Sequence, residues 1–286
     1  MQDRHIGDVR VTRIEEQMGP GFPAKDFFPE FDADTFAAEG HWLAPSYYQP
    51  ESGRLMTSIH SWLLRTGNHT ILVDACSGNH KPRPGMPRFD MLNTQYLERL
   101  REAGVEPEEI DFVMCTHLHV DHVGWNTRLV GGKWVPTFAN ARYVFGRTEY
   151  EHWRDHGDAP DKAAVFGDSV KPVVDAGKAD LVASDARLAD EITLVPTPGH
   201  SPGHMSVHIR SDGEEALLTG DVAHHPCQMA HLDWSSTADS DPRQSAETRR
   251  ELFSRFADTP TLVIGGHFRA GHIRRDGAAF KFVALG

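Results

Sequence analysis

The sequence contains few cysteines, and their placement argues against a disulfide-stabilised protein. Only three occur in 286 residues, Cys76, Cys115 and Cys227, and they are widely separated. An odd and scattered set does not form a disulfide framework, which agrees with a reducing compartment. The N-terminal residues also lack the apolar core of a secretory signal. We therefore expect a cytoplasmic protein.

Long apolar runs and an excess of positive charge are also missing. No stretch approaches the roughly 20 apolar residues that are needed to cross a bilayer, so no transmembrane helix is expected. Acidic residues outnumber basic ones by 41 to 29, which gives a formal net charge of -12. Because nucleic acids and anionic membranes attract basic surfaces, this balance argues against both as partners.

No Gly/Ser/Pro linker, internal repeat or low-complexity tract divides the chain, so we expect a single domain over residues 1–286. Expected strands are 8–14, 57–65, 69–74, 111–115, 142–146, 191–196, 204–210, 215–219 and 261–266. Expected helices are 91–103, 147–156 and 243–256. Hairpin turns are predicted at Gly67-Asn68 and Asp212-Gly213. Hairpins mixed with helices predict an α/β (α+β) fold, in which two mixed sheets pack together with helices on the outer faces.

Histidine is abundant, with 18 residues, and one short run concentrates it. Thr-His-Leu-His-Val-Asp-His places His117, His119, Asp121 and His122 within six consecutive residues. Imidazoles and carboxylates this dense are costly to bury unless a cation holds them together. On an extended segment the first two ligands share a side, while the next two can reach a second position. The run indicates two neighbouring metal sites, and the alternative is a solvated histidine-rich loop.

Three later segments share one pattern. In each, an apolar predicted strand ends in small residues and is followed by a residue that can bind a metal ion. They deliver His200, Asp221 and His267. Each alone has an ordinary explanation, since His after Gly is often a turn residue and Asp after a strand is often a cap. Their common format at the ends of predicted strands favours a shared metal site.

These residues together resemble the metallo-β-lactamase superfamily of hydrolases, whose His-x-His-x-Asp-His motif is matched in full from His117 to His122. The resemblance covers roughly residues 8 to 280 and implies a four-layer αβ/βα sandwich with a dinuclear site at one edge. It implies that His117, His119 and His200 bind the first metal. Asp121, His122 and His267 would bind the second, and Asp221 would bridge them. Zinc is the expected metal, although iron, manganese or cobalt would fit the same donors.

Such a site predicts hydrolysis without a Ser or Cys nucleophile. Metal coordination lowers the pKa of water from about 15.7 towards 7, so a metal-bridging hydroxide is available near neutral pH. It would attack an acyl or phosphoryl centre. Asp121 could orient the nucleophile or carry a proton to the leaving group.

Departures from relatives narrow the expected reaction. Oxygen-reducing members usually have Glu where this chain has His119, and zinc β-lactamases typically lack the carboxylate of Asp221. The short segment after His267 leaves no helical glutathione-binding region, and the acidic balance opposes RNA. The remaining branch contains acyl-homoserine lactonases and methyl parathion hydrolase. The expected substrate is therefore a small apolar lactone or ester, and hydrolysis of phosphotriesters and aryl esters is expected as a side activity. Thioester or β-lactam-type amide hydrolysis is the alternative reaction, and a metal-binding protein without turnover is disfavoured.

Two features bear on the substrate. His224, three residues after Asp221, stands where acyl-homoserine lactonases tend to have Tyr, and it could donate to a developing oxyanion or merely bond a carboxylate. Residues 21–50 are rich in aromatics, including Phe22, Phe27 and Phe28. We expect an irregular excursion there. It would form either an apolar lid over the metals or a packing surface, including a homodimer contact.

Overall fold

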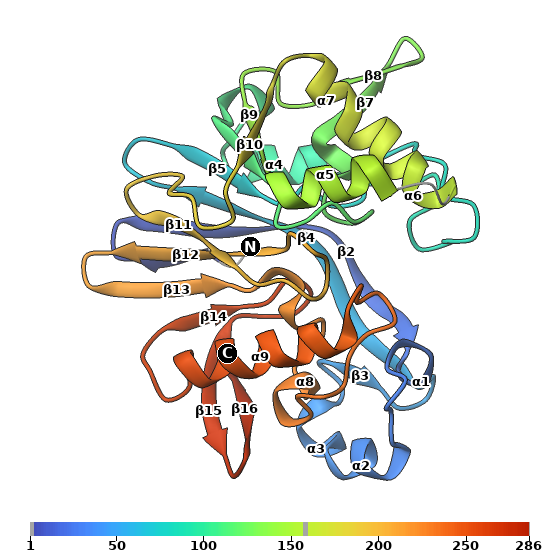
Figure 1. Cartoon of the computed structure of the whole chain (residues 1–286), viewed down its shortest axis with the longest axis vertical. Coiled ribbons are helices and arrows are strands. Elements are labelled where there is room, and N and C mark those ends of the chain that lie inside the picture. Colours follow the sequence, from blue (N-terminus) through green and yellow to red (C-terminus); the bar gives the residue numbers. More distant parts are fainter. Residues whose placement is uncertain (1–2, 157–159, 286) are drawn as a thin grey trace.

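The chain folds into four layers, with two sheets in the middle and helices on both outer faces (Figure 1). The computed structural model describes residues 3–156 and 160–285. Its strands are β1 (Asp3–Ile6), β2 (Val9–Pro23), β3 (Tyr48–Gln49), β4 (Arg54–Arg65), β5 (Thr70–Val73), β6 (Phe112–Met114), β7 (Thr127–Val130), β8 (Lys133–Pro136), β9 (Arg142–Gly146), β10 (Ala179–Val182), β11 (Ile192–Pro196), β12 (Met205–Ser211), β13 (Glu214–Leu218), β14 (Leu262–Ile264), β15 (Gly271–Asp276) and β16 (Ala279–Ala284). Its α-helices are α1 (Ala24–Phe27), α2 (Ala33–Ala38), α3 (Gly40–Leu43), α4 (Tyr96–Glu102), α5 (Arg147–His156), α6 (Pro160–Val165), α7 (Lys171–Asp175), α8 (Cys227–Ala230) and α9 (Pro242–Phe256). The predicted αβ/βα sandwich is confirmed.

Both sheets mix parallel and antiparallel pairs, as predicted. In the first sheet the described strands run in the order β1-β2-β4-β5-β6-β9-β10, with β3 beside β4. Strands β5, β6, β9 and β10 are mutually parallel neighbours. The second sheet has the order β11-β12-β13-β14-β15-β16, in which β13 and β14 are parallel. The predicted turns at Gly67-Asn68 and Asp212-Gly213 join antiparallel strands, β4 to β5 and β12 to β13.

Apolar clusters fill the spaces between the layers, because successive residues of a strand face opposite sides. On β4, Leu63 packs in the cluster that contains Tyr96 of α4. Its neighbour Leu64 packs between the two sheets, in the cluster that contains Val207 of β12. The strand is therefore buried on both faces at its apolar run Trp62-Leu63-Leu64.

A third cluster lies between the second sheet and α9. Leu252, Phe253 and Phe256 of α9 are buried in it, so the apolar stripe that the sequence predicts is confirmed. The helix starts after Asp241, whose side chain accepts a hydrogen bond from the backbone N–H of Gln244. This cap, followed by proline in the first turn, fixes where the helix begins.

Two predicted boundaries are wrong by five residues or more. Strand β2 continues to Pro23 rather than ending near residue 14, because its second half still pairs with β4 and places Met18 opposite Ser58. Helix α4 begins at Tyr96 rather than at residue 91, because Met91 has a left-handed φ of 47°. Residues 92–95, just before the helix, form a loop. In this loop the backbone N–H of Thr94 donates to Asn79 Oδ1 at 2.8 Å.

The segment 21–50 is more regular than expected. It contains the end of β2 and the three short helices α1, α2 and α3. Helices this short are not stable alone, so tertiary packing must hold them. Phe28 and Phe36 are fully buried in the cluster with Trp234. Sequence periodicity could not reveal these helices, because segments of four to six residues are too short to show a helical repeat.

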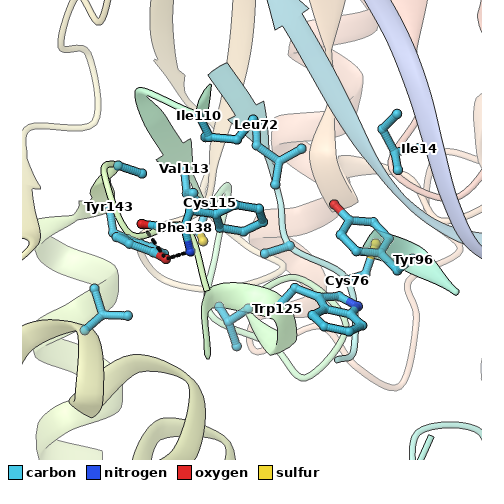
Figure 2. Close-up of a cluster of buried hydrophobic side chains, with 14 of the residues drawn as sticks. Ile14, Leu72, Cys76, Tyr96, Ile110, Val113, Cys115, Trp125, Phe138 and Tyr143 are labelled. Atoms are coloured by element: carbon cyan, nitrogen blue, oxygen red, sulfur yellow. Dashed lines mark hydrogen bonds between the residues drawn. The ribbon is translucent and has the colours of Figure 1, made fainter. Parts of the chain in front are cut away.

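The core around β6 fixes the strand that precedes the histidine-rich run (Figure 2). Val113 and Cys115 are fully buried beside Phe138 and Tyr143. The backbone N–H of Phe138 donates to Tyr143 Oη at 2.9 Å, which satisfies the one polar atom of that ring. The ligand run therefore begins from a rigid support. Among the described residues, no helix combines the length and apolar character that crossing a membrane requires.

Candidate metal centre

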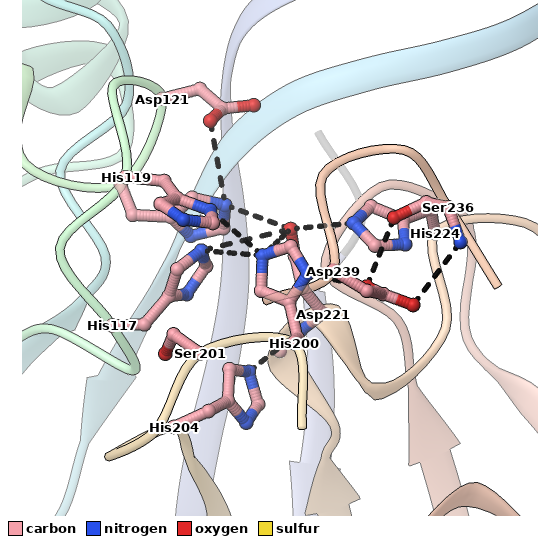
Figure 3. Close-up of polar contacts among 12 residues, drawn as sticks. His117, His119, Asp121, His200, Ser201, His204, Asp221, His224, Ser236 and Asp239 are labelled. Atoms are coloured by element: carbon pink, nitrogen blue, oxygen red, sulfur yellow. Dashed lines mark hydrogen bonds and ion pairs between the residues drawn. The ribbon is translucent and has the colours of Figure 1, made fainter. Parts of the chain in front are cut away.

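The seven predicted ligands meet at one edge of the sandwich, where strands of both sheets end. His117, His119, Asp121 and His122 follow β6 of the first sheet, and His200, Asp221 and His267 follow β11, β13 and β14 of the second. Figure 3 shows the side chains of His117, His119, His200 and Asp221 converging. This placement is the one that open α/β sheets favour for chemistry, at the carboxyl ends of their strands. The structure brings together all seven residues that the sequence predicts as metal ligands.

His117, His119 and His200 form the first group of ligand atoms. Nε2 of His200 lies 3.1 Å from Nε2 of His117 and 2.8 Å from Nδ1 of His119. The other nitrogen of His200 bonds Asp239 Oδ1 at 2.8 Å, and that of His117 faces Thr116 Oγ1 at 3.0 Å. A neutral ring that donates from Nδ1 carries its lone pair on Nε2. Lone pairs therefore point at one another among these rings.

Asp121, His122 and His267 form the second group. Nε2 of His122 and Nε2 of His267 each lie 3.8 Å from a carboxylate oxygen of Asp121. Asp221 lies between the groups, with its Oδ2 3.3 Å from Nε2 of His122 and 3.1 Å from Nε2 of His267. The same oxygen lies 3.5 Å from Nε2 of His200. Asp221 is thus within reach of both groups.

Divalent cations fit this arrangement better than hydrogen bonding alone. Among the described residues, His122 Nε2 and Asp221 Oδ1 are buried side-chain atoms that have no hydrogen-bond partner. Burial, reinforced by neighbouring imidazoles, lowers the pKa of His117 and of His119 well below its usual value. Both rings are therefore neutral, which is the form that binds metals. Converging lone pairs and unpartnered buried atoms are costly without a ligand that satisfies them.

Two buried carboxylates that are not among the predicted site residues orient these rings. Asp239 accepts from Nδ1 of His200, and Oδ2 of Asp74 lies 2.9 Å from Nδ1 of His122. Burial opposes ionisation of Asp239, but its bond to His200 holds the pKa of that carboxyl far below its usual range. Asp74 follows β5, so its position after a buried strand could have revealed it. Asp239 lies in a loop and carries no local pattern.

Glu149 of α5 connects the two loops that carry the first group of ligands. Its Oε1 accepts from the backbone N–H of Leu118 at 3.0 Å and from Trp153 Nε1 at 2.6 Å. Its Oε2 accepts from Ser201 Oγ at 2.7 Å and from the backbone N–H of Gly203 at 2.9 Å. Leu118 is in the ligand run and the other two loop residues are in the turn after β11, so one buried carboxylate fixes both. No sequence pattern reveals this role, because Glu149 resembles any acidic residue in a first helical turn.

Asp221 owes its position to a close backbone approach. The backbone N–H of Asp221 donates to Nε2 of His204 at 2.9 Å, which gives His204 a structural role beside the ligands. Gly220, with a φ of 53°, precedes it, and a Cβ there would lie 2.6 Å from His204 Nε2. Both the left-handed backbone and the lack of space favour glycine at this position.

His224 is buried beside the ligands, and its Nε2 lies 3.3 Å from Asp221 Oδ2. Burial lowers its pKa although Asp221 opposes that change, so the ring is neutral and keeps one N–H. Its position also lets His200, Asp221 and His224 form a further group of ligand atoms. The ring of Phe27 lies edge-on to His224, with 5.2 Å between the ring centroids.

A pocket of about 530 Å³ opens above this cluster. Its floor includes His119, Asp121, His200, Asp221, His224 and His267. Its walls are mainly apolar and include Phe22, Phe27, Ile59, Met86, Phe89, Leu118, Trp153, Val165 and Phe166. Segment 21–50 therefore contributes two rings to the pocket, whereas Phe28 and Phe36 pack in the core. The segment therefore lines the pocket with some of its aromatic side chains and packs against the core with others.

Comparison with known proteins agrees with this geometry. A family model described as the metallo-beta-lactamase superfamily matches residues 56–267. The N-acyl homoserine lactonase AiiA of Bacillus thuringiensis subsp. kurstaki is 29% identical over 189 residues, which cover 60% of this chain and 67% of that protein.

Solved structures show the same fold over nearly the whole chain. The hydrolase AbOPH of the beta-lactamase superfamily has a TM-score of 0.82 at 22% identity and covers 99% of this chain and 97% of its own. The dizinc quorum-quenching lactonase AidC has a TM-score of 0.81 at 18% identity and covers 100% of this chain and 97% of its own.

Proposed function

Since the chain belongs to the metallo-beta-lactamase superfamily, we propose that it is a dinuclear metal-dependent hydrolase that opens lactones or cleaves related esters. The observation that carries this proposal is the pair of ligand groups, joined by Asp221, on the floor of an apolar pocket. The lactonase activity of the relative AiiA supports the choice of substrate class. A small apolar lactone or ester fits such walls, which offer few polar partners.

The first metal ion would be held by His117, His119 and His200, and the second by Asp121, His122 and His267, with Asp221 in contact with both. Zinc suits this set of imidazoles and carboxylates, and iron, manganese or cobalt would accept the same donors. When bound, the cations lower the pKa of a coordinated water from about 15.7 towards 7 and so supply a nucleophile at neutral pH.

The protein's own side chains then direct the reaction. Water oxygen bonds to the acyl carbon, the acyl carbon–oxygen bond breaks, and the proton released by water ends on the leaving oxygen. Asp121 is half-buried at the pocket floor and carries that proton. His224 donates its N–H to the carbonyl oxygen, an interaction that strengthens as negative charge develops there. The product of a lactone is the open hydroxy acid.

Metal analysis combined with a panel of substrates tests this function. We expect two metal ions per chain, turnover of lactones or aryl esters, loss of turnover on chelation and recovery with zinc. The panel includes thioesters, phosphotriesters and β-lactams. Exclusive turnover of thioesters or β-lactams would replace the lactonase proposal by the alternative amide or thioester reaction. Two bound metal ions without hydrolysis of any class of substrate would contradict the proposal that the protein is an enzyme.

Location and assembly belong to the same proposal. All three cysteines are buried and free, which supports a reducing, cytoplasmic compartment. The net charge of -12 supports a small-molecule substrate rather than a nucleic acid. A homodimer contact through segment 21–50 is tested by light scattering of the intact protein and of a variant in which the exposed Phe22 is replaced by Ser.

A further inference from the structure

The chain between β5 and α4 closes on itself as a loop, residues 80–92. The backbone N–H of His80 donates to Leu92 O at 2.9 Å, and that of Met91 donates to Lys81 O at 2.8 Å. His80 and Met91 have left-handed φ values of 61° and 47°. Such values are uncommon outside glycine and persist only where the surroundings impose them. The two ends of the loop are therefore tightly constrained.

Loop 80–92 forms one wall of the pocket above the metal centre. Five consecutive residues line it, Gly85, Met86, Pro87, Arg88 and Phe89. Prolines at positions 82, 84 and 87 restrict the backbone further. Inside the loop the backbone N–H of Phe89 donates to Met86 O at 2.8 Å. The wall is preformed, so its position limits what enters the pocket.

A buried ionic cluster attaches the base of the loop to a different segment. Arg83 makes two parallel hydrogen bonds to Asp168, from Nη1 to Oδ2 at 2.7 Å and from Nη2 to Oδ1 at 2.8 Å. Lys81 Nζ lies 3.4 Å from Asp168 Oδ1 and donates to Thr127 Oγ1 at 2.8 Å. The side chains of Arg83 and Lys81 are almost completely buried. Asp168 therefore compensates two cations that have left water.

Asp168 lies next to another part of the pocket lining, Val165 and Phe166. It belongs to the π-helical turn Phe166–Val170, which follows α6. Val165 and Phe166 line the pocket and pack in the same apolar cluster as Met86 and Phe89 of the loop. In Figure 1 the loop runs beside α6. One carboxylate outside the lining thus connects two parts of the pocket wall, and it lies far from the metal ligands along the chain.

The tip of the loop has a second attachment, through Arg88. Its Nη1 donates to Pro20 O at 3.0 Å and its Nη2 donates to Thr57 O at 3.2 Å. These bonds attach the loop to β2, which contains Phe22, and to β4. The wall is held at both ends.

We propose that loop 80–92 sets the length of apolar chain that the pocket accepts, and that Asp168 is the positioning residue that fixes this wall. That the reacting group is a lactone or ester rests on the proposed function. The preference for a certain chain length depends only on the pocket walls. The portion of a substrate that does not react meets apolar side chains of these walls, namely Met86, Phe89, Val165 and Phe166. Substrates with apolar acyl chains of several carbons are therefore preferred over short ones.

The test uses Asp168→Asn in the metal-loaded protein, with Asp180→Asn as its control. Asp180 also bonds an arginine, Arg142, through two nitrogens, but lies on β10 away from the pocket lining. Straight-chain carboxylates from butanoate to decanoate are titrated by calorimetry. Each added methylene should strengthen binding to wild type and control, and Asp168→Asn should lose at least about tenfold on decanoate, the effect of one to two methylenes in an apolar pocket. Butanoate affinity should change less than about twofold, because its short chain gains little from the walls.

Kinetics on butanoyl and decanoyl lactones give the second measurement. The loss should appear as a raised KM for the long substrate, with kcat and the metal content retained. Arg83→Gln should reproduce the change, and the double variant should lose no more than either single one, since both act through one pair. If Asp168→Asn does not fold, Arg88→Met tests the other attachment of the same loop.

An unchanged dependence on chain length in the folded variants would overturn the proposal, and so would an equal loss for all chain lengths. If the wild type hydrolyses no lactone but its affinity for carboxylates rises with chain length and Asp168→Asn removes that rise, the proposed reaction fails and the inference about the wall stands.

Discussion

Nδ1 of His200 donates a hydrogen bond to Oδ1 of Asp239 across 2.8 Å, and both side chains are almost completely enclosed. Asp239 is itself fixed, because it accepts from the backbone N–H of Ser236 at 3.1 Å and from the hydroxyl of the same residue at 2.9 Å. Nη2 of Arg249, which is also buried, lies 3.7 Å from Oδ2 of Asp239. This set of contacts determines which nitrogen of His200 is free for a metal.

Asp239→Asn should therefore weaken the first metal site. An amide keeps the shape but no longer favours a proton on Nδ1, and loss of such a partner costs roughly 10- to 100-fold in metal affinity. Competitive zinc titration of the variant measures this loss. Asp233→Asn, at an exposed residue that pairs with Arg250, serves as the control. Equal affinity in both variants would show that Asp239 only stabilises its loop.

Glu149→Gln should destabilise the fold even without metal. Glu149 accepts four hydrogen bonds, two of them from backbone N–H groups, and an amide in its place can accept through only one oxygen. Leaving buried donors unpaired costs about 1 to 3 kcal/mol. Denaturant unfolding of chelator-treated protein gives the free energy of unfolding. Glu151→Gln, at an exposed position of the same helix, should leave that energy unchanged.

His224→Ala should lower kcat by about 100-fold while the metal content stays at that of the wild type, because a donor to the developing oxyanion is removed. Steady-state kinetics and metal analysis on the same sample decide the matter. His231→Gln, which changes a half-buried residue paired with Glu39, controls for the loss of an imidazole. A loss of one metal ion in His224→Ala would instead identify His224 as a ligand.

Lys81 predicts a specific pH dependence of stability. Burial lowers its pKa from 10.5 to about 8, although Asp168 opposes the change. Between these two values the unfolded chain binds more protons at Lys81 than the folded one does, so the contribution of Lys81 to stability becomes less unfavourable as pH rises. Below about pH 8 the cost is fully present.

Comparison with Lys81→Met isolates this contribution. The free energy of unfolding of wild type minus that of the variant should rise as the pH increases from 8 to 10.5, and it should be constant below pH 8. Denaturant unfolding at a series of pH values measures it. Parallel curves for the two proteins across the whole range would contradict the shifted pKa.

The sequence predicted the layers better than the short elements. Leu252 and Phe256 repeat at helical spacing, and the runs before His117 and Asp221 are apolar enough to be buried strands, so α9, β6 and β13 follow from local patterns. The hairpin of β15 and β16 was not predicted, since its charged residues Arg274 and Arg275 interrupt the apolar pattern. Helices α1 to α3 depend on packing around Trp234, which lies about 200 residues further along the chain.

The candidate ligands were accessible from the sequence because metal binding demands particular side chains at strand ends. His117 to His122 form a local motif, and His200, Asp221 and His267 each follow a strand of recognisable type. Of the residues that orient them, only Asp74 has a local signal, because it follows a buried strand as the ligands do. Asp239, Glu149 and Asp74 act through hydrogen bonds to distant segments, and an isolated carboxylate in the sequence is usually a solvated residue.

The sequence by itself determined the ligand chemistry and the layered architecture, because both depend on residue type and local spacing. Only the tertiary structure decided how the pocket is bounded. The pairing of Arg83 with Asp168 joins segments 85 positions apart, and the seating of Phe27 against His224 joins segments still further apart. Such contacts are selected by burial and shape among many equally plausible partners, so they exist only once the chain has packed.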